Sequence, residues 1–405
     1  MKKILHVSNN LYNGGAEAVF RSNLKILAKD YNNIVFSSFD TEDKKKLNNF
    51  LSVYNIKYYK AKNYYEYRFP RNLLNYIYSY NAKNEIKRII EKEKPDYIHL
   101  HDYLFFSPSI LDMIIKLKNV FEYKVILTAH NFHLICPNAS LFNFSKNKVC
   151  SKCILYKKNL IFKENCDYRG KIYSFIKFLR YNKLKRINFE KIDFIISPSY
   201  FMKRKLQEFG LKNKIITIRN PIELNSKIIE KEAKENIIIF FGRLTKEKNI
   251  LKIIESFKSL QNSNYQLLIA GDGPEKDKVL KLIKNSKNIH FLGKLNSKDL
   301  EKYLVKSKFS IMASIWYENA PMAIIESINN KVIPLTSNIG GMKELSNYFS
   351  CSIRFNPYDV NDITDKIKYA INNYEKIFNE VEWKKISDFS FEKYEKQIRE
   401  IYHGK

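Results

Sequence analysis

Glycine and proline are scarce in this chain, with 11 and 10 residues among 405. Fibrous and disordered chains usually contain far more of both, so this scarcity argues against those two classes. Long apolar runs are also missing, because no stretch approaches the roughly 18 to 20 residues that a membrane-spanning helix needs. The apolar start of the chain is interrupted by His6 and ends at Ser8, which is too short for a secretory signal. We therefore expect a globular protein that stays in the cytoplasm.

Cysteine is rare as well, with five residues, which should stay reduced in the cytoplasm unless a metal binds them. Four of them fall in one segment, as Cys136, the C-x2-C pair Cys150 and Cys153, and Cys166. Thiolates at such spacing suit a tetrahedral ion, so a structural zinc site and a loop of reduced thiols are the two alternatives. Cys351 stands apart and is expected to be a small buried hydrophobic residue.

Acidic residues are few relative to basic ones, 42 against 71, which gives a formal charge of +29. Such a charge favours nucleic acid, anionic membranes or anionic substrates. The basic residues are spread along the chain without a nucleic-acid-binding module, so we expect no nucleic acid partner. The segment from Lys171 to Lys191 mixes basic with aromatic and apolar residues. It is either an ordinary covering helix or a peripheral contact with the anionic inner face of the plasma membrane.

Short apolar runs alternate with helical segments from end to end. The first run, Lys3 to Ser8, is followed by Gly14-Gly15 and an amphipathic helix from about Ala16 to Leu27. Strands of four to six residues separated by helices indicate parallel sheets covered by helices. The other predicted strands are 33–37, 97–100, 124–128, 194–197, 215–218, 236–241, 266–270, 288–292, 309–312 and 332–336.

A chain of 405 residues is too long for one ordinary core, and its strand pattern restarts after Asn220-Pro221. Two similar α/β halves in tandem suggest two Rossmann-like domains that face each other across a cleft. We expect an N-terminal domain over 1–220, with a cysteine-containing insertion over 136–166, and a C-terminal domain over 221–380. The remaining residues, 381–405, have helical period near the end.

Ligands of open parallel sheets bind beyond the C-terminal ends of the strands. The strand 236–241 is followed by Gly242, Arg243 and, five residues later, Lys248. Two cations at this spacing suit a diphosphate, although a solvated basic loop is the alternative. Gly271 follows the next strand, where it either allows close approach of a ligand or simply makes a turn into a helix.

The segment after strand 309–312 contains two glutamates, Glu318 and Glu326. Between them, Asn319 is predicted to cap a helix and Pro321 to lie in its first turn. The free N–H groups of that helix would face a phosphate or a sugar oxygen. Glu318 can then accept hydrogen bonds from sugar hydroxyls and Glu326 can reach a ribose, although two solvated glutamates are the alternative.

The N-terminal half offers weaker signals. Gly14-Gly15 opens a helix after the first strand but lacks a full dinucleotide-binding fingerprint. His130 follows strand 124–128 and is either a satisfied core residue or a group at the edge of a ligand site.

Taken in order, these elements resemble the large family four of retaining glycosyltransferases, which has the GT-B fold. The resemblance implies two facing Rossmann-like domains and a C-terminal helix that returns to the N-terminal domain. It covers nearly the whole chain, and the Glu-x7-Glu element beside two cations is its most specific part. The matching pieces are Gly14-Gly15-Ala16-Glu17, Lys94-Pro95-Asp96, His130, Asn220-Pro221, Gly242-Arg243 with Lys248, Gly271-Asp272-Gly273-Pro274, Glu318 with Glu326, and Gly340-Gly341 with Glu344.

The resemblance also implies roles. Arg243 and Lys248 would stabilise the leaving diphosphate, and His130 would contact the donor sugar near the reacting carbon. Glu318 would bind the sugar hydroxyls and Glu326 the ribose, with retention of configuration and no metal needed for catalysis. The remaining donor contacts would come from Gly15, Gly242, Gly271, Asn319, Ala320, Pro321 and Met322.

We therefore expect a retaining glycosyltransferase that uses a UDP- or GDP-sugar and a saccharide or polyprenyl-linked acceptor, in cell-surface polysaccharide assembly. Asn319 and Ala320 replace a segment that more often contains glycine, so the donor sugar stays open. Two alternatives also stay open. One is a GT-B nucleotide-sugar epimerase, and the other is a non-catalytic basic protein that binds membrane or nucleic acid.

Overall fold

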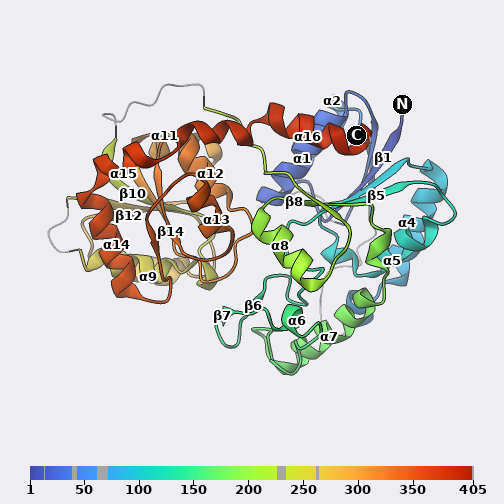
Figure 1. Cartoon of the computed structure of the whole chain (residues 1–405), viewed down its shortest axis with the longest axis horizontal. Helices are drawn as coiled ribbons and strands as arrows, with labels where there is room; N and C mark the ends of the chain where they lie inside the picture. Colours follow the sequence, from blue (N-terminus) through green and yellow to red (C-terminus); the bar gives the residue numbers. More distant parts are fainter. Residues whose placement is uncertain (13, 39–42, 62–71, 226–233, 261–263, 404–405) are drawn as a thin grey trace. The chain divides into compact units, whose positions relative to one another are not determined.

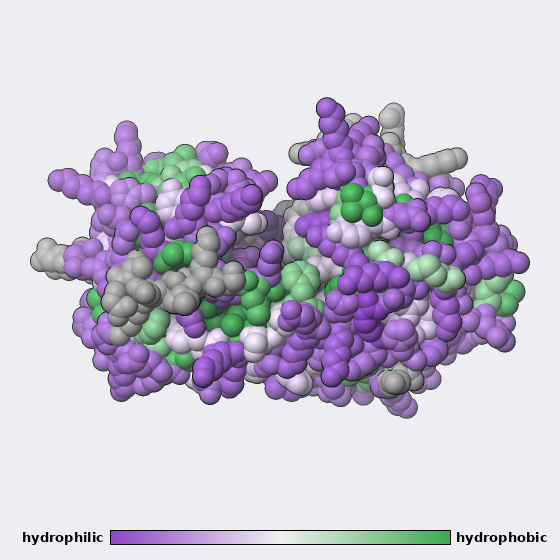
Figure 2. All heavy atoms as spheres, turned by 90° about the horizontal axis from the view of Figure 1, so that it is seen from above, coloured by the Kyte–Doolittle hydropathy of each residue, from purple (hydrophilic) through white to green (hydrophobic). Residues whose placement is uncertain are grey.

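The computed structural model describes residues 1–12, 14–38, 43–61, 72–225, 234–260 and 264–403. The chain forms two compact units, one of Met1–Pro221 with Tyr394–Lys405 and the other of Ile222–Lys393. Each unit has one parallel sheet with helices packed against it (Figure 1). The face drawn in Figure 2 is mostly hydrophilic, with hydrophobic side chains gathered in few places. Among the described residues, no helix is both long enough and apolar enough to cross a membrane.

The first unit is built on a seven-stranded parallel sheet in the order β3-β2-β1-β4-β5-β8-β9. Its central strands are buried almost throughout, as a parallel sheet covered on both faces requires. Leu5 in the central strand β1 pairs with Ile34 on one side and Ile98 on the other. The strands are β1 (Lys3–Ser8), β2 (Asn32–Ser37), β3 (Lys57–Lys60), β4 (Tyr97–Leu100), β5 (Lys124–Thr128), β8 (Phe194–Ser197) and β9 (Lys214–Thr217).

The C-terminal helix α16 (Phe391–His403) packs against this first sheet. Tyr394 and Ile398 share one hydrophobic cluster with Ile4 of β1. The Tyr97 hydroxyl also donates a hydrogen bond to the Tyr402 carbonyl at 2.6 Å. The end of the chain therefore returns to the N-terminal sheet, as expected. The other helices of this unit are α1 (Gly15–Leu27), α2 (Lys44–Val53), α3 (Leu73–Ile77), α4 (Tyr80–Glu93), α5 (Ser109–Leu117), α6 (Lys152–Leu155), α7 (Lys171–Lys185) and α8 (Tyr200–Phe209).

The predicted insertion lies between β5 and β8. It contains a short antiparallel pair, β6 (Phe142–Asn143) and β7 (Lys148–Val149), followed by α6. Asn138 in its first loop accepts a hydrogen bond from Lys177 of α7 at 2.7 Å. The insertion is thus tied to the helix that follows it in the chain.

The second unit repeats the Rossmann-like order with a six-stranded parallel sheet, β12-β11-β10-β13-β14-β15. Its strands are β10 (Glu235–Phe241), β11 (Gln266–Ala270), β12 (Ile289–Gly293), β13 (Ser307–Met312), β14 (Ile333–Ser337) and β15 (Arg354–Phe355). Its helices are α9 (Ile250–Lys258), α10 (Lys276–Ile283), α11 (Ser297–Lys306), α12 (Met322–Asn329), α13 (Gly340–Tyr348), α14 (Val360–Asn372) and α15 (Tyr374–Glu380). The strand order reverses between β10 and β13, and such a reversal is where α/β sheets bind ligands.

Candidate active site

Two loops meet where the strand order of the second unit reverses. The loop after β10 carries Gly242 and Arg243 and leads into the short helix η4 (Lys246–Lys248). The loop after β13 leads to Glu318. Its Ile315 N–H donates a hydrogen bond to the carbonyl of Glu247 at 2.9 Å. The backbone therefore fixes the two loops against each other before any side chain is considered.

Glu318 is the most strongly held side chain at this point. One carboxylate oxygen, Oε1, accepts hydrogen bonds from Lys248 Nζ at 2.6 Å, Trp316 Nε1 at 2.6 Å and Ser314 Oγ at 3.0 Å. Burial favours the neutral acid, but the Lys248 charge and these hydrogen bonds outweigh it, so the pKa of Glu318 is lowered. Glu318 is consequently an ionised, oriented acceptor.

The two predicted cations are not equivalent. Lys248 is paired with Glu318, and both side chains are largely buried. Arg243 is exposed, and its guanidinium makes no ion pair with any residue in the described part of the chain. Arg243 is therefore the cation with its full charge available to an anionic ligand, whereas Lys248 already neutralises a carboxylate.

The helix that follows Glu318 begins later than the sequence predicts. Pro321 is the N-cap residue of α12, and no side chain caps the helix. The predicted cap at Asn319 and the predicted place of Pro321 in the first turn are therefore wrong. The reason is that Pro321 has extended backbone, with ψ at 112°, so helical geometry starts only at Met322. An uncapped helix start with its positive dipole end suits an anion.

Glu326 lies in the second turn of α12 and differs from Glu318 in its surroundings. It is half-buried, and burial raises its pKa. Its carboxylate makes no hydrogen bond or ion pair to the residues that the structure describes. A half-buried carboxylate without partners costs stability, so Glu326 is free to accept a hydrogen bond from a ligand.

Two glycines allow the backbones of neighbouring loops to come into close contact. Gly271 has φ at +156°, and a Cβ there would lie 1.9 Å from the carbonyl oxygen of Gly242. The N–H of Gly341 donates to the Glu318 carbonyl at 2.8 Å, and a Cβ there would lie 1.8 Å from the Asn319 oxygen. Gly242 itself has open space beside it. Gly271 and Gly341 thus let backbone pack on backbone around the residues discussed above.

The first unit places Gly15 and His130 at the ends of two strands of its own sheet. Gly15 is the first residue of α1, just beyond β1, and Gly14 before it has extended backbone. His130 follows β5 and is half-buried, and burial lowers its pKa to about 4. The His130 imidazole is therefore neutral at physiological pH and suits hydrogen bonding rather than charge stabilisation.

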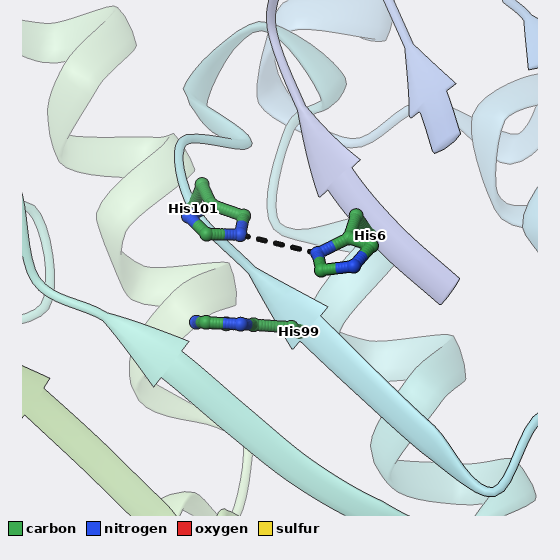
Figure 3. Close-up of side chains that lie close together, drawn as sticks. All are labelled: His6, His99 and His101. Carbon is green, nitrogen blue, oxygen red and sulfur yellow. Dashed lines mark hydrogen bonds between the residues drawn. The ribbon is translucent and has the colours of Figure 1, made fainter. Parts of the chain in front are cut away.

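Beside His130 lies a group of three buried histidines that the sequence analysis missed (Figure 3). The ligand nitrogens of His6, His99 and His101 lie within 4.8 Å of one another, a spacing that a metal ion can bridge. His6 Nδ1 lies 3.3 Å from His101 Nε2, and the rings of His101 and His130 are stacked with centroids 6.0 Å apart. The sequence signal was the His-x-His spacing at the end of β4, which puts two side chains on one face.

Hydrogen bonds occupy both nitrogens of two of these histidines. His6 Nε2 lies 2.9 Å from Asn33 Oδ1, while His6 Nδ1 faces His101. His99 Nδ1 lies 2.7 Å from the Tyr402 hydroxyl, and His99 Nε2 lies 2.8 Å from Thr128 Oγ1. Burial lowers the pKa of all three. The group is thus a neutral network that ties β1, β4, β5 and α16 together.

Asp102 is a second residue that the sequence analysis missed. It follows His101 at the end of β4, and its Oδ1 accepts a hydrogen bond from the N–H of Leu104 at 3.1 Å. Burial raises the pKa of Asp102 to about 6, although that hydrogen bond acts to lower it. The Asp102 carboxyl is therefore harder to ionise than an exposed aspartate.

All four insertion cysteines line one small cavity with Leu141, Phe142 and Ile161. They are free thiols, as is Cys351, which is buried as expected. Their sulfur atoms do not form a tight tetrahedron. In the described ranges, the histidine group is the only set of three or more ligand atoms within 4.8 Å of one another.

Comparison with known proteins identifies the family of this chain. The family described as "Glycosyltransferase Family 4" matches residues 13–226, and "Glycosyl transferases group 1" matches residues 221–381. An "Uncharacterized 42.6 kDa protein in cps region" of Klebsiella pneumoniae is 25% identical over 313 residues, 75% of this chain and 73% of that protein.

A second relative is named for its substrate. It is the Campylobacter jejuni "GalNAc-alpha-(1->4)-GalNAc-alpha-(1->3)-diNAcBac-PP-undecaprenol alpha-1,4-N-acetyl-D-galactosaminyltransferase", 29% identical over 117 residues, 28% of this chain and 32% of that enzyme. Among solved structures, Anabaena Alr3699/HepE in complex with UDP and glucose superposes over 100% of both chains with a TM-score of 0.69 at 14% identity. The fold is therefore GT-B, and the chain belongs to glycosyltransferase family 4.

Proposed function

We propose that this glycosyltransferase moves a sugar, with retention, from a nucleotide-diphosphate donor to a saccharide or polyprenyl-linked acceptor in cell-surface polysaccharide assembly. The observation that best supports this proposal is the difference between two glutamates near the start of α12. Lys248 orients Glu318, whereas Glu326 has no partner in the described chain. The UDP and glucose bound by the HepE structure support a UDP-sugar donor. The name of the Campylobacter relative supports a lipid-linked glycan as acceptor.

In this proposal the second unit holds the donor. Arg243 binds the diphosphate and stabilises the charge that develops as it leaves, which is usually the largest catalytic contribution. The start of α12, from Asn319 to Met322, holds phosphate or sugar oxygens. Glu318 accepts hydrogen bonds from the sugar hydroxyls, and Glu326 accepts them from the ribose.

The first unit takes the acceptor. Residues 1–220 would act as the acceptor domain and 221–380 as the donor domain. Neutral His130 would donate a hydrogen bond to the donor sugar, and Gly15 would let the loop after β1 approach the diphosphate. The enzyme would work on the cytoplasmic side, where nucleotide-sugars and the inner face of the membrane meet.

Replacement of Glu326 by glutamine separates stability from binding. We expect Glu326→Gln to raise the melting temperature of the free protein at neutral pH, because burial disfavours the charged form. Since the folded pKa lies above the ordinary value of 4.5, this gain is full above the folded pKa and disappears as the pH falls below 4.5. The same variant should bind UDP about 10-fold more weakly, because a ribose hydrogen bond to a charged acceptor is lost. Thermal shift with and without UDP measures both.

The exposed Glu255→Gln on α9 is the matched control and should change neither quantity. Incubation with labelled UDP- and GDP-sugars and a polyprenyl-diphosphate glycan then tests the reaction itself. A new glycoside with free nucleotide is expected. Isomerised donor without release of nucleotide would establish the epimerase alternative, and UDP affinity unchanged in Glu326→Gln would refute the role given to this glutamate.

We also propose a structural zinc ion between Cys136, Cys150, Cys153 and Cys166. Burial raises the pKa of Cys136, although hydrogen bonds from the backbone N–H groups of residues 138, 140 and 141 to its sulfur oppose that shift. Burial raises the pKa of Cys153 to about 12, so its thiolate needs a positive partner. Zinc would supply that charge, and the four sulfurs would have to move closer together than they lie in this structure to bind it.

Metal analysis of the purified protein decides on the zinc ion. About one zinc per chain is expected, lost in Cys150→Ser/Cys153→Ser but kept in Cys351→Ser. Less than about half a zinc per chain in the wild type would rule the site out.

A further inference from the structure

Large apolar side chains are exposed in unusual number around the insertion. Exposed hydrophobic residues are normally scattered singly over a protein surface. Here the segment 155–175 alone exposes Leu155 (73%), Tyr156 (62%), Phe162 (46%), Tyr168 (71%), Ile172 (67%) and Phe175 (44%). Figure 1 places α6 and α7 together at the end of the first unit away from α16.

Hydrogen bonds and ring contacts join part of this segment to helix α7. Asn159 donates to the carbonyl of Phe178 and to Asn182, each at 2.9 Å, so the chain after α6 runs along α7. Farther along, the rings of Phe162 and Phe175 lie 5.3 Å apart. Ile172 lies one helical turn before Phe175 and therefore on the same face of α7. We call the surface of Phe162, Ile172 and Phe175 the insertion face.

Helix α7 has a second, inward side. Ile176, Tyr181 and Leu184 are buried, and the Tyr181 hydroxyl donates to the Leu134 carbonyl at 2.9 Å. The helix thus covers the first unit with one side and exposes apolar residues on the other. The two alternatives that the sequence left open for this segment are therefore compatible.

Positive charge is concentrated around the insertion face. Residues 151–186 contain eleven lysines and arginines and two acidic residues, a net +9 of the chain's +29 in less than a tenth of its length. Both acidic residues are already neutralised: Glu164 by Lys146 and Lys152, and Asp167 by Arg169 and Lys177. Basic residues occur along the whole chain, but in this segment an excess of lysine and arginine surrounds exposed apolar rings.

We infer that the insertion face docks on an anionic lipid bilayer. Apolar side chains flanked by lysines suit such a surface, because the rings enter the interfacial region while the cations bind lipid phosphates. A protein partner would have to be both apolar and acidic, and nothing in the chain calls for one. The inference rests on the proposed function in one respect, since docking would hold the first unit where a polyprenyl-linked acceptor lies.

Vesicle sedimentation tests the docking directly. The full-length wild type should bind phosphatidylcholine vesicles that contain about 30% phosphatidylglycerol at least 10-fold more tightly than pure phosphatidylcholine vesicles, and added salt should weaken that binding. Phe162→Ser/Phe175→Ser should reduce binding about 10-fold by removing apolar anchors. Lys157→Gln/Lys158→Gln should reduce binding to the anionic vesicles and leave binding to pure phosphatidylcholine vesicles unchanged.

The control is Leu280→Ser/Leu282→Ser on α10, which removes two apolar residues of similar exposure (40% and 42%) from a lysine-rich helix of the second unit. It should bind like the wild type. Equal binding by the Phe162/Phe175 variant, or no binding by the wild type, would overturn the inference. So would a concentration-dependent dimer that the same variant abolishes, because a second copy would then cover this face.

A separate assay of sugar transfer to a water-soluble acceptor, without vesicles, distinguishes a failure of the docking inference from a failure of the proposed function. None of the six substituted residues belongs to the candidate active site, so all three variants should keep wild-type turnover in that assay. Vesicle binding without any turnover would leave the docking in place and reject the transferase. Turnover without vesicle binding would support the transferase and reject the docking.

Discussion

Lys248→Met should lower turnover about 10²-fold, a loss typical of misplacing a positioning group by about 1 Å. The structure gives the reason for the loss. Lys248 Nζ lies 2.6 Å from Glu318 Oε1 and is the only cation paired with that carboxylate among the described residues. Without it, Glu318 keeps only the neutral donors Ser314 and Trp316. We therefore expect the pKa of Glu318 to rise and the free energy of unfolding to fall by about 1–3 kcal/mol.

The pH dependence of that destabilisation follows from the direction of the shift. The folded pKa of Glu318 is lowered in the wild type, so the ion pair stabilises the fold above the ordinary value of 4.5. This contribution is lost as the pH falls through the folded pKa. The difference in unfolding free energy between wild type and Lys248→Met, measured by urea titration, should thus be largest near pH 7 and shrink in acid.

Two further variants make the prediction specific. Lys246→Met changes an exposed lysine of the same short helix and should leave turnover and stability unchanged. Lys248→Met/Glu318→Gln removes both charges, so it should recover most of the stability but none of the turnover. Wild-type turnover in the single variant, or recovery of turnover in the double one, would contradict the role of Lys248.

Most of the fold could be predicted because its central strands are buried on both faces. Each predicted strand is present, with ends shifted by at most two residues. The missed strands β3 and β15 lie at sheet edges. β3 reads Lys-Tyr-Tyr-Lys with exposed ends and β15 spans two residues, so neither produces an apolar run. The antiparallel pair β6–β7 was missed for the same reason.

The candidate site could be predicted only in part. Motif order and the rule for strand ends were enough to bring Arg243, Lys248 and Glu318 to one edge of the sheet. They could not reveal that Lys248 is paired with Glu318 while Arg243 is not, because that depends on side-chain distances. The histidine network and the raised pKa of Asp102 arise from burial by segments distant in sequence. The His-x-His spacing puts His99 and His101 on one face, but no local pattern encodes their burial.

Gly341→Ala should be the most damaging substitution of a single methyl group at this site. The added Cβ would lie 1.8 Å from the carbonyl oxygen of Asn319 and 2.7 Å from that of Glu318. Both obstacles are backbone, so no side-chain rotation relieves them. Neighbouring Met342 and Leu345 are buried in the core, which prevents α13 from retreating. The loop that carries Glu318 must therefore move.

That displacement reaches the proposed donor site directly. Gly341 N–H holds the Glu318 carbonyl at 2.8 Å, and the same residue's carboxylate is held by Lys248. A shift of about 1 Å in a positioning group typically costs 10²-fold in rate, and overpacking costs about 1–3 kcal/mol of stability. We expect losses of this size in turnover and unfolding free energy, together with weaker UDP binding.

Gly293→Ala is the control that distinguishes the effect of a steric clash from the effect of replacing a glycine. Gly293 has φ at +71° with nothing within 4 Å of an added Cβ, so alanine there is strained but does not displace a neighbour. It should lower the melting temperature by a few degrees, as a strain of about 1 kcal/mol implies, and leave UDP affinity intact. If Gly341→Ala behaved like this control, with stability reduced and UDP affinity unchanged, the loop of Glu318 would not be part of the donor site. A loss of affinity confined to Gly341→Ala would instead mean that the contact between α13 and this loop sets the position of the sugar-binding carboxylate.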